Sequence, residues 1–89
     1  MKQQWKERKR PQRLERRYEF DSYDDLRDFL DRAADISEQQ SLYPDMGFGR
    51  DYVNITIHAD EESGELETRQ REFAEALESL SKDMTGVRN

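Results

Sequence analysis

The sequence is poor in several residue types, and each shortage excludes a class of protein or site. None of its 89 residues is cysteine, which excludes disulfides and thiolate metal sites and suits a reducing cytosol. Its four glycines form no phosphate-binding loop, and its single histidine leaves mainly carboxylates as metal ligands. No stretch approaches the roughly 20 apolar residues of a membrane span, and the basic start of the chain lacks the apolar run of a signal peptide. We therefore expect no metal, no disulfide and no membrane anchor.

Large apolar residues are also scarce, which limits the core that the chain can build. Leu, Ile, Val and Phe together make up 16 of the 89 residues, or about 18%, close to the level of roughly 20% below which disorder becomes an alternative. The periodic placement of these residues and the nine aromatic side chains favour a single folded domain instead. Because a domain of this size buries little surface, we expect a homodimer, whose interface would add buried area.

Charge is distributed unevenly along the chain, although the net charge is only −6. Residues 1–17 carry eight Lys or Arg against two Glu, a local net charge of +6, whereas residues 18–89 carry a net charge of −12. We interpret residues 1–12 as a basic arm, which can include a short strand over residues 5–10, residues 13–83 as the folded domain, and residues 84–89 as a frayed end. The arm either pairs with the acidic domain or steers an acidic partner toward it.

Alternation of apolar and polar residues predicts two strands. The apolar sets are Leu14, Tyr18 and Phe20 in residues 13–20, and Val53, Ile55 and Ile57 in residues 53–59. Arg16 falls on the apolar side of the first strand, so we expect it to lie near an edge or to extend its stem to water. Residues 41–49, which Pro44 interrupts, form an extended segment best placed at a sheet edge.

Apolar spacings of three and four residues predict two helices. Asp21 and Ser22 cap the first helix, which runs to about Gln39, and the second helix runs from about Glu67 to Lys82. Their apolar faces are Leu26, Phe29, Leu30, Ala33 and Ile36 in the first helix, and Phe73, Ala76, Leu77, Leu80 and Met84 in the second. The order of elements predicts an α+β fold, a four-stranded antiparallel sheet with two helices packed on one face. The uncovered face would present Asn54, Thr56 and His58, and it must stay hydrated or be covered by a partner.

This order of elements, together with one local motif, resembles the pterin carbinolamine dehydratases. Their signature is an acidic residue, three spacers, two histidines and a proline, followed by an aromatic residue, a third histidine or a tryptophan, and an aspartate that opens the last helix. The chain carries this frame as Glu38, three spacers, Leu42-Tyr43 and Pro44, and the resemblance covers roughly residues 5–80. It implies the pterin dehydratase-like fold.

The resemblance breaks at the positions that would carry the chemistry. Leu42 and Tyr43 replace the histidine pair, and Arg50 replaces the aromatic residue. Asp60 replaces the third histidine, and Gln70 replaces the aspartate of the last helix. Expulsion of the 4a-hydroxyl group from a pterin needs a proton donor and acceptor that work near neutral pH, as imidazole does with its pKa of about 6.5. Leucine has no side-chain proton to exchange, and free tyrosine and aspartate titrate at about 10 and about 3.9. The resemblance therefore implies a degenerate active site, no enzymatic activity and no cofactor.

Two alternatives stay open on the sequence alone. His58 has the same strand parity as Asp60, which would place the two side chains about 6–7 Å apart and could provide a dehydratase with an altered active site. The basic residues around Trp5 could instead bind nucleic acid or serve regulation, although the acidic domain would repel phosphates.

A non-catalytic branch of the same family is a closer likeness. This branch comprises the dehydratase-like RuBisCO assembly factors of α-carboxysomes, and the shared segments are residues 8–20, 29–32, 43–45 and 48–50. The likeness implies a chaperone of the bacterial cytosol, associated with carboxysomes, that binds RuBisCO large subunits and promotes their assembly for carbon fixation. The residues that we expect at the partner interface are Arg10, Arg13, Arg17, Tyr43, Asp45, Phe48, Arg50, Tyr52 and His58.

Overall fold

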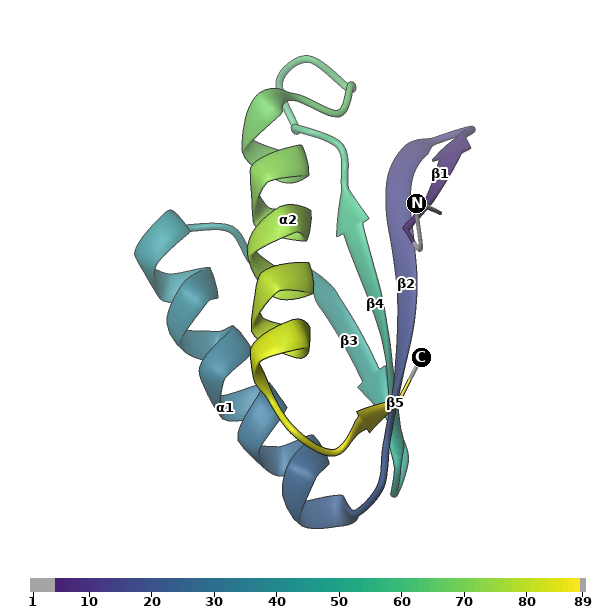
Figure 1. Ribbon diagram of the computed structural model, residues 1–89. Helices are drawn as coiled ribbons and strands as arrows, with labels where there is room; N and C mark the ends of the chain where they lie inside the picture. The colour runs from purple at the N-terminus through teal and green to yellow at the C-terminus, as the bar shows by residue number, and fades with distance from the viewer. Residues whose placement is uncertain (1–4, 89) are drawn as a thin grey trace.

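The computed structural model describes residues 5–88 and confirms the predicted α+β fold. Two helices cover one face of an antiparallel sheet and leave its other face open (Figure 1). In chain order the elements are β1 (Lys6–Lys9), β2 (Gln12–Phe20), α1 (Tyr23–Gln40), β3 (Asp45–Phe48), β4 (Tyr52–His58), α2 (Thr68–Asp83) and β5 (Val87–Arg88). The sheet order is β1-β2-β4-β3, and β5 also pairs with β2, so a short fifth strand joins the four that the sequence predicts. Within residues 5–88, no helix has the length and apolar character needed to cross a membrane.

The central strand β2 determines which residues face the helices. Its register with β4 places Leu14 opposite Ile57 and Tyr18 opposite Val53. All four of these side chains are buried on the helix side of the sheet. Because successive side chains of a strand point to opposite faces, the alternate residues Glu15 and Arg17 of β2, with their partners Thr56 and Asn54 of β4, point to the open face.

The helix α1 begins and packs as its sequence predicts. The Ser22 hydroxyl accepts a hydrogen bond from the backbone N–H of Asp25 at 3.1 Å, which satisfies one of the free donors of the first turn. Phe29 is fully buried, and its ring lies 5.1 Å from the ring of Tyr18 and 5.4 Å from that of Phe20 between centroids. These three aromatic rings join the helix to β2 and form the centre of the core.

The helix α2 differs from its prediction on one face. Its buried residues are Gln70, Phe73, Ala74, Leu77 and Ser81. Ala74 therefore takes the inward position that the sequence assigned to Ala76, which is only half-buried. Two polar residues share the buried row, and each has a backbone partner. The Ser81 hydroxyl donates to the carbonyl of Glu78 at 2.8 Å, and the Gln70 side-chain oxygen accepts from the N–H of Glu67 at 2.8 Å.

The prediction for Arg16 was wrong, because a partner on α2 holds this residue in the core. Arg16 is buried and donates from Nε and Nη2 to the two carboxylate oxygens of Glu78, at 3.1 and 3.2 Å. The Tyr18 hydroxyl donates to the same carboxylate at 2.6 Å, and the guanidinium lies 4.0 Å from the centroid of the Tyr18 ring. Burial favours a raised pKa for Glu78, but the hydrogen bonds from Arg16 and Tyr18 outweigh it and lower the pKa. Burial, followed by the bond to Glu78, raises the pKa of Tyr18.

The C-terminal segment differs from the frayed end that the sequence suggested. Val87–Arg88 form β5, which pairs with Glu19 and Phe20 of β2. The turn before β5 is made by Gly86, which has a φ of +87° and whose carbonyl accepts from the N–H of Asp21 at 2.7 Å. A two-residue strand carries too little apolar alternation to be recognised in a sequence.

Part of the basic arm belongs to the sheet. β1 pairs with β2 from Lys6 opposite Glu15 to Lys9 opposite Gln12, and Trp5 is buried. Residues 1–4 of the arm lie outside the described residues. The strand is also tied to the helix layer, because Arg71 of α2 donates to both carboxylate oxygens of Glu7, at 3.1 and 3.2 Å.

Candidate functional site

The open face of the sheet carries a cluster of charged and polar side chains from four strands. β1 contributes Lys6 and Arg8, β2 contributes Arg13, Glu15, Arg17 and Glu19, β3 contributes Asp45, and β4 contributes Tyr52, Asn54, Thr56 and His58. A hollow of about 390 Å³ lies between β1, β2 and β4 and is lined by Lys6, Arg8, Glu15, Arg16, Arg17, Asn54, Ile55 and Thr56. The sheet face that was predicted to have no covering helix is therefore polar, is basic on the β1 side, and contains a hollow.

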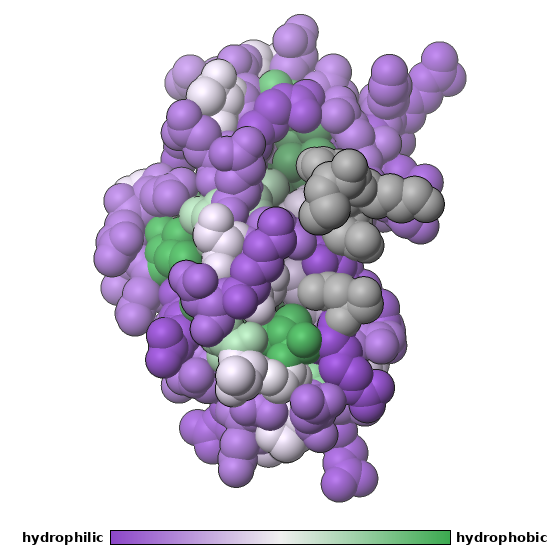
Figure 2. All heavy atoms as spheres, viewed as in Figure 1, coloured by the Kyte–Doolittle hydropathy of each residue, from purple (hydrophilic) through white to green (hydrophobic). Residues whose placement is uncertain are grey.

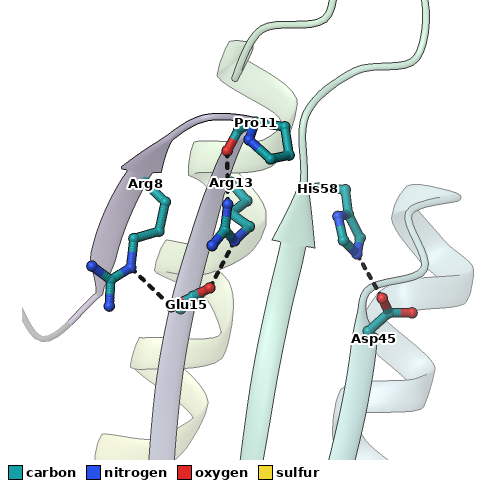
Figure 3. A network of polar contacts seen from close by, with 6 residues as sticks. All are labelled: Arg8, Pro11, Arg13, Glu15, Asp45 and His58. Carbon is teal, nitrogen blue, oxygen red and sulfur yellow. Dashed lines mark hydrogen bonds and ion pairs between the residues drawn. The ribbon is translucent and has the colours of Figure 1, made fainter.

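Glu15 organises the basic side of this face. It accepts from Nε of Arg8 at 3.1 Å and from Nε of Arg13 at 2.7 Å (Figure 3). The hydrogen bond from Arg13, followed by that from Arg8, lowers the pKa of Glu15. Arg13 is held further by a bond from its Nη1 to the carbonyl of Pro11 at 3.0 Å. Because two arginines share one carboxylate, the cluster keeps an excess of positive charge.

Arg17 is fixed over an aromatic ring on the same face. Its guanidinium carbon lies 4.1 Å from the centroid of the Tyr52 ring, a cation–π arrangement. Its Nε also donates to Glu19 at 3.2 Å. The Tyr52 ring lies so close to Gly49 that a side chain at that position would collide with it. The absence of a side chain at Gly49 therefore allows the ring to lie under the guanidinium.

His58 pairs with a different acid from the one that strand parity suggested. Its Nε2 lies 2.6 Å from Oδ2 of Asp45 on the neighbouring strand β3, and both side chains are exposed (Figure 3). Asp45 is opposite Thr56, so it is the diagonal neighbour of His58 and within reach of it. Asp60 lies beyond the end of β4 and is used in the following turn, where it accepts from the N–H of Glu62 at 2.9 Å. The alternative pairing of His58 with Asp60 is therefore not formed.

Two of the expected interface residues lie on the helix side, at the β3 edge of the sheet. Tyr43 and Phe48 are 71% and 54% exposed. They line a shallow groove of about 450 Å³ with Leu30, Ala34, Ser37, Glu38, Pro44 and Met46. The view in Figure 2 is mostly hydrophilic, with hydrophobic residues in small separate patches. Arg10 and Arg50 are exposed in the turns that follow β1 and β3. The nine expected residues thus divide between the open face, this groove and two turns.

The positions that the family resemblance aligned with an active site have structural uses here. Leu42 is a core residue, and the Gln70 side chain is buried and caps the start of α2. Asp60 caps a turn, whereas Tyr43 and Arg50 project from the surface. Among the described residues, no group of three or more His, Asp or Glu side chains is placed to hold a metal ion.

Sequence reasoning missed two members of the basic cluster, Arg8 and Glu15. Arg8 fell within the short strand expected over residues 5–10, but it was not assigned to the partner interface. Its register opposite Arg13 puts both residues on one face. Alternation within residues 6–9 could have indicated this, because Lys6 and Arg8 share one parity. Glu15 was not among the expected interface residues, and its hydrogen bond with Arg8 depends on the position of β1.

The fold and the site define a class, a pterin dehydratase-like α+β domain with an open charged sheet face. The chain matches the family described as pterin 4 alpha carbinolamine dehydratase over residues 1–80, and it belongs to this family. One similar solved structure is a pterin dehydratase-like protein identified as a RuBisCO assembly factor in the alpha-carboxysome. Its TM-score is 0.76 at 37% identity, over 88% of this chain and 89% of that one.

A second solved structure shares the fold alone. It is a transcriptional coactivator/pterin dehydratase from Brucella melitensis, with a TM-score of 0.79 at 16% identity, over 86% of this chain and 81% of that one. None of the curated proteins matches the chain.

Proposed function

We propose that the chain is a non-catalytic member of its family that binds RuBisCO large subunits and promotes their assembly. The observation that carries this proposal is the 37% identity, across almost the whole chain, to a dehydratase-like RuBisCO assembly factor. We extend the proposal to a homodimer in the bacterial cytosol, associated with carboxysomes, since so small a core gains from a shared interface. Sedimentation velocity would test the dimer, and a monomer at micromolar concentration would contradict it.

The uses of the former active-site positions support the absence of catalysis. A dehydratase needs a donor and an acceptor of protons facing one pocket. Leu42 is in the core and Gln70 is committed to a helix cap. The single imidazole of the chain, His58, lies at an exposed strand end and is paired with Asp45.

A capture experiment tests binding of the client. Since the chain has no cysteine, the variant Asp35→Cys offers a single attachment point for biotin on α1, in the layer opposite the open face. The immobilised protein is incubated with isolated RuBisCO large subunits and with assembled RuBisCO as a control. We expect retention of the unassembled subunits in moderate salt. Failure to retain them would refute the proposed function.

An assembly assay and an enzyme assay complete the test. Co-expression with the large and small subunits should raise the yield of assembled RuBisCO relative to an empty vector. With a 4a-carbinolamine substrate, formation of the quinonoid product should not exceed the uncatalysed rate. Turnover that is lost in His58→Ala and kept in Asp35→Cys would instead identify a dehydratase with an altered active site.

A further inference from the structure

The hollow on the open face is bordered mainly by cations, although the chain as a whole is acidic. Lys6, Arg8 and Arg17 line the hollow, whereas Glu15 is its single lining carboxylate. The net charge of the whole chain is −6. A basic hollow on an acidic protein attracts anionic groups and directs them to one place.

The arrangement of Arg8 and Arg13 is unfavourable unless an anion lies between them. The two residues are directly opposite each other in the register of β1 and β2, and like charges in opposed positions destabilise a sheet. Glu15 lies between them and accepts one bond from each through Nε alone (Figure 3). Within the part of the chain that the structure describes, both terminal nitrogens of Arg8 and Nη2 of Arg13 make no hydrogen bond. These nitrogens are available to a second carboxylate.

Arg17 adds a fixed cation on the other side of the hollow. Its position over the Tyr52 ring and its bond to Glu19 hold the guanidinium in place. The side chain is nevertheless 49% exposed, so a ligand can reach it. A guanidinium that is already ordered loses less freedom on binding, which favours bidentate recognition of a carboxylate.

We propose that the open face binds an acidic, extended segment of the partner protein, with side-chain carboxylates held by Arg8 and Arg17. This inference rests on the proposed function and names the chemistry by which the partner is held. Polypeptide carboxylates fit better than a nucleic acid. Glu15, Glu19 and Asp45 are interspersed among the cations and would repel a continuous phosphate backbone, whereas separate carboxylates can be placed between them. Arginine clusters that bind acidic motifs are a recurrent mode of peptide recognition.

The direct test uses a fluorescein-labelled hexaglutamate peptide and fluorescence anisotropy. The double variant Arg8→Gln/Arg17→Gln should bind the peptide about tenfold more weakly than the wild type. Its matched control is Arg27→Gln/Arg32→Gln, which removes the same charge from the exposed surface of α1 and should bind within about twofold of the wild type. The variant Arg17→Lys should fall between them, because it keeps the charge and loses the fork. Circular dichroism establishes that each variant is folded.

Three results of the peptide assay would overturn the inference. These are an equal loss of affinity in the two double variants, no binding of hexaglutamate to the wild type at about 50 mM salt, and tighter binding of a 12-nucleotide single-stranded DNA than of the peptide. Capture of RuBisCO large subunits separates the inference from the proposed function. If the wild type and Arg8→Gln/Arg17→Gln retain the subunits equally, the open face is not the docking site and the function stands. If the wild type binds hexaglutamate but retains no subunit, the proposed function fails and the acidic-peptide site stands.

Discussion

Replacement of Glu78 by alanine should destabilise the fold by about 3 kcal/mol, because it leaves a buried guanidinium without its carboxylate. Glu78 accepts two hydrogen bonds from Arg16 and one from Tyr18. The Arg16 side chain is only 4% exposed and would keep its bond to the carbonyl of Arg17 at 2.9 Å. Loss of one partner from a buried ion pair costs about 3–5 kcal/mol. Since Glu78 is 23% exposed, water can enter the vacated space, which favours the lower end of that range.

Urea unfolding followed by the fluorescence of Trp5 would measure this loss. Trp5 is the single tryptophan, is buried, and packs edge-on against Tyr18 with ring centroids 6.4 Å apart, so it reports on the same part of the core. A domain of 89 residues has a total stability of roughly 4–13 kcal/mol. With a urea dependence of about 1 kcal/mol per molar, the unfolding midpoint should fall by about 3 M.

Two control variants define what would refute this reasoning. Glu75→Ala changes an exposed glutamate of the same helix and should alter the stability by no more than about 0.5 kcal/mol. The double variant Arg16→Met/Glu78→Leu should recover most of the loss, because apolar residues often replace a buried ion pair without penalty. Equal midpoints for Glu78→Ala and Glu75→Ala would show that Arg16 does not need its partner. A double variant as unstable as Glu78→Ala would assign the loss to packing rather than to removal of the Glu78 carboxylate from Arg16.

Three further predictions concern pH, the core and the last strand. The pKa of Glu78 is lowered from its ordinary value of 4.5. The ionised carboxylate therefore stabilises the fold above about pH 4.5, and this stabilisation is lost as the pH falls through the lowered pKa. The urea midpoints of the wild type and of Glu78→Gln should converge in acid, and a difference that stays constant with pH would contradict this. Phe29→Ala should cost about 3–5 kcal/mol and bring the domain close to unfolding, whereas Tyr23→Ala, at a residue 51% exposed, should melt near the wild-type temperature. Gly86→Ala should loosen β5, since Gly86 has a φ of +87°, a backbone conformation that alanine rarely adopts, and the new methyl group would displace the Asp25 carboxylate. Faster hydrogen exchange of the Asp21 amide would detect the change, and unchanged exchange would refute the prediction.

The sequence predicts the layers of this fold well because their signals are local. Alternation in β2 and β4 and the three-and-four spacing of both helices each depend on residues within one segment. Arg16 shows where this local information ends. Parity correctly places its side chain on the apolar face, but its partner Glu78 is 62 residues away. Only tertiary packing brings α2 over β2, so the sequence alone predicted a stem reaching for water.

The candidate site shows the same division between local and distant information. Strand parity predicts that Asn54, Thr56 and His58 share the open face, which follows from one strand alone. The acid that His58 meets depends on the register between β3 and β4, which sets Asp45 beside it. The parity of residues along β4 could suggest only Asp60 as the partner of His58. The basic cluster was likewise incomplete, because Arg8 joins it only when β1 pairs with β2.

The alternation of β2 restricts where this chain can tolerate a change in length. Glu15, Arg16 and Arg17 are consecutive, yet the middle residue belongs to the core and its neighbours belong to the open face. Insertion or deletion of one residue here would reverse every following side chain and move charges inward. Substitutions at the open-face positions of β2 should therefore preserve the fold, and changes in length should be accepted best in the exposed turn at residues 60–65.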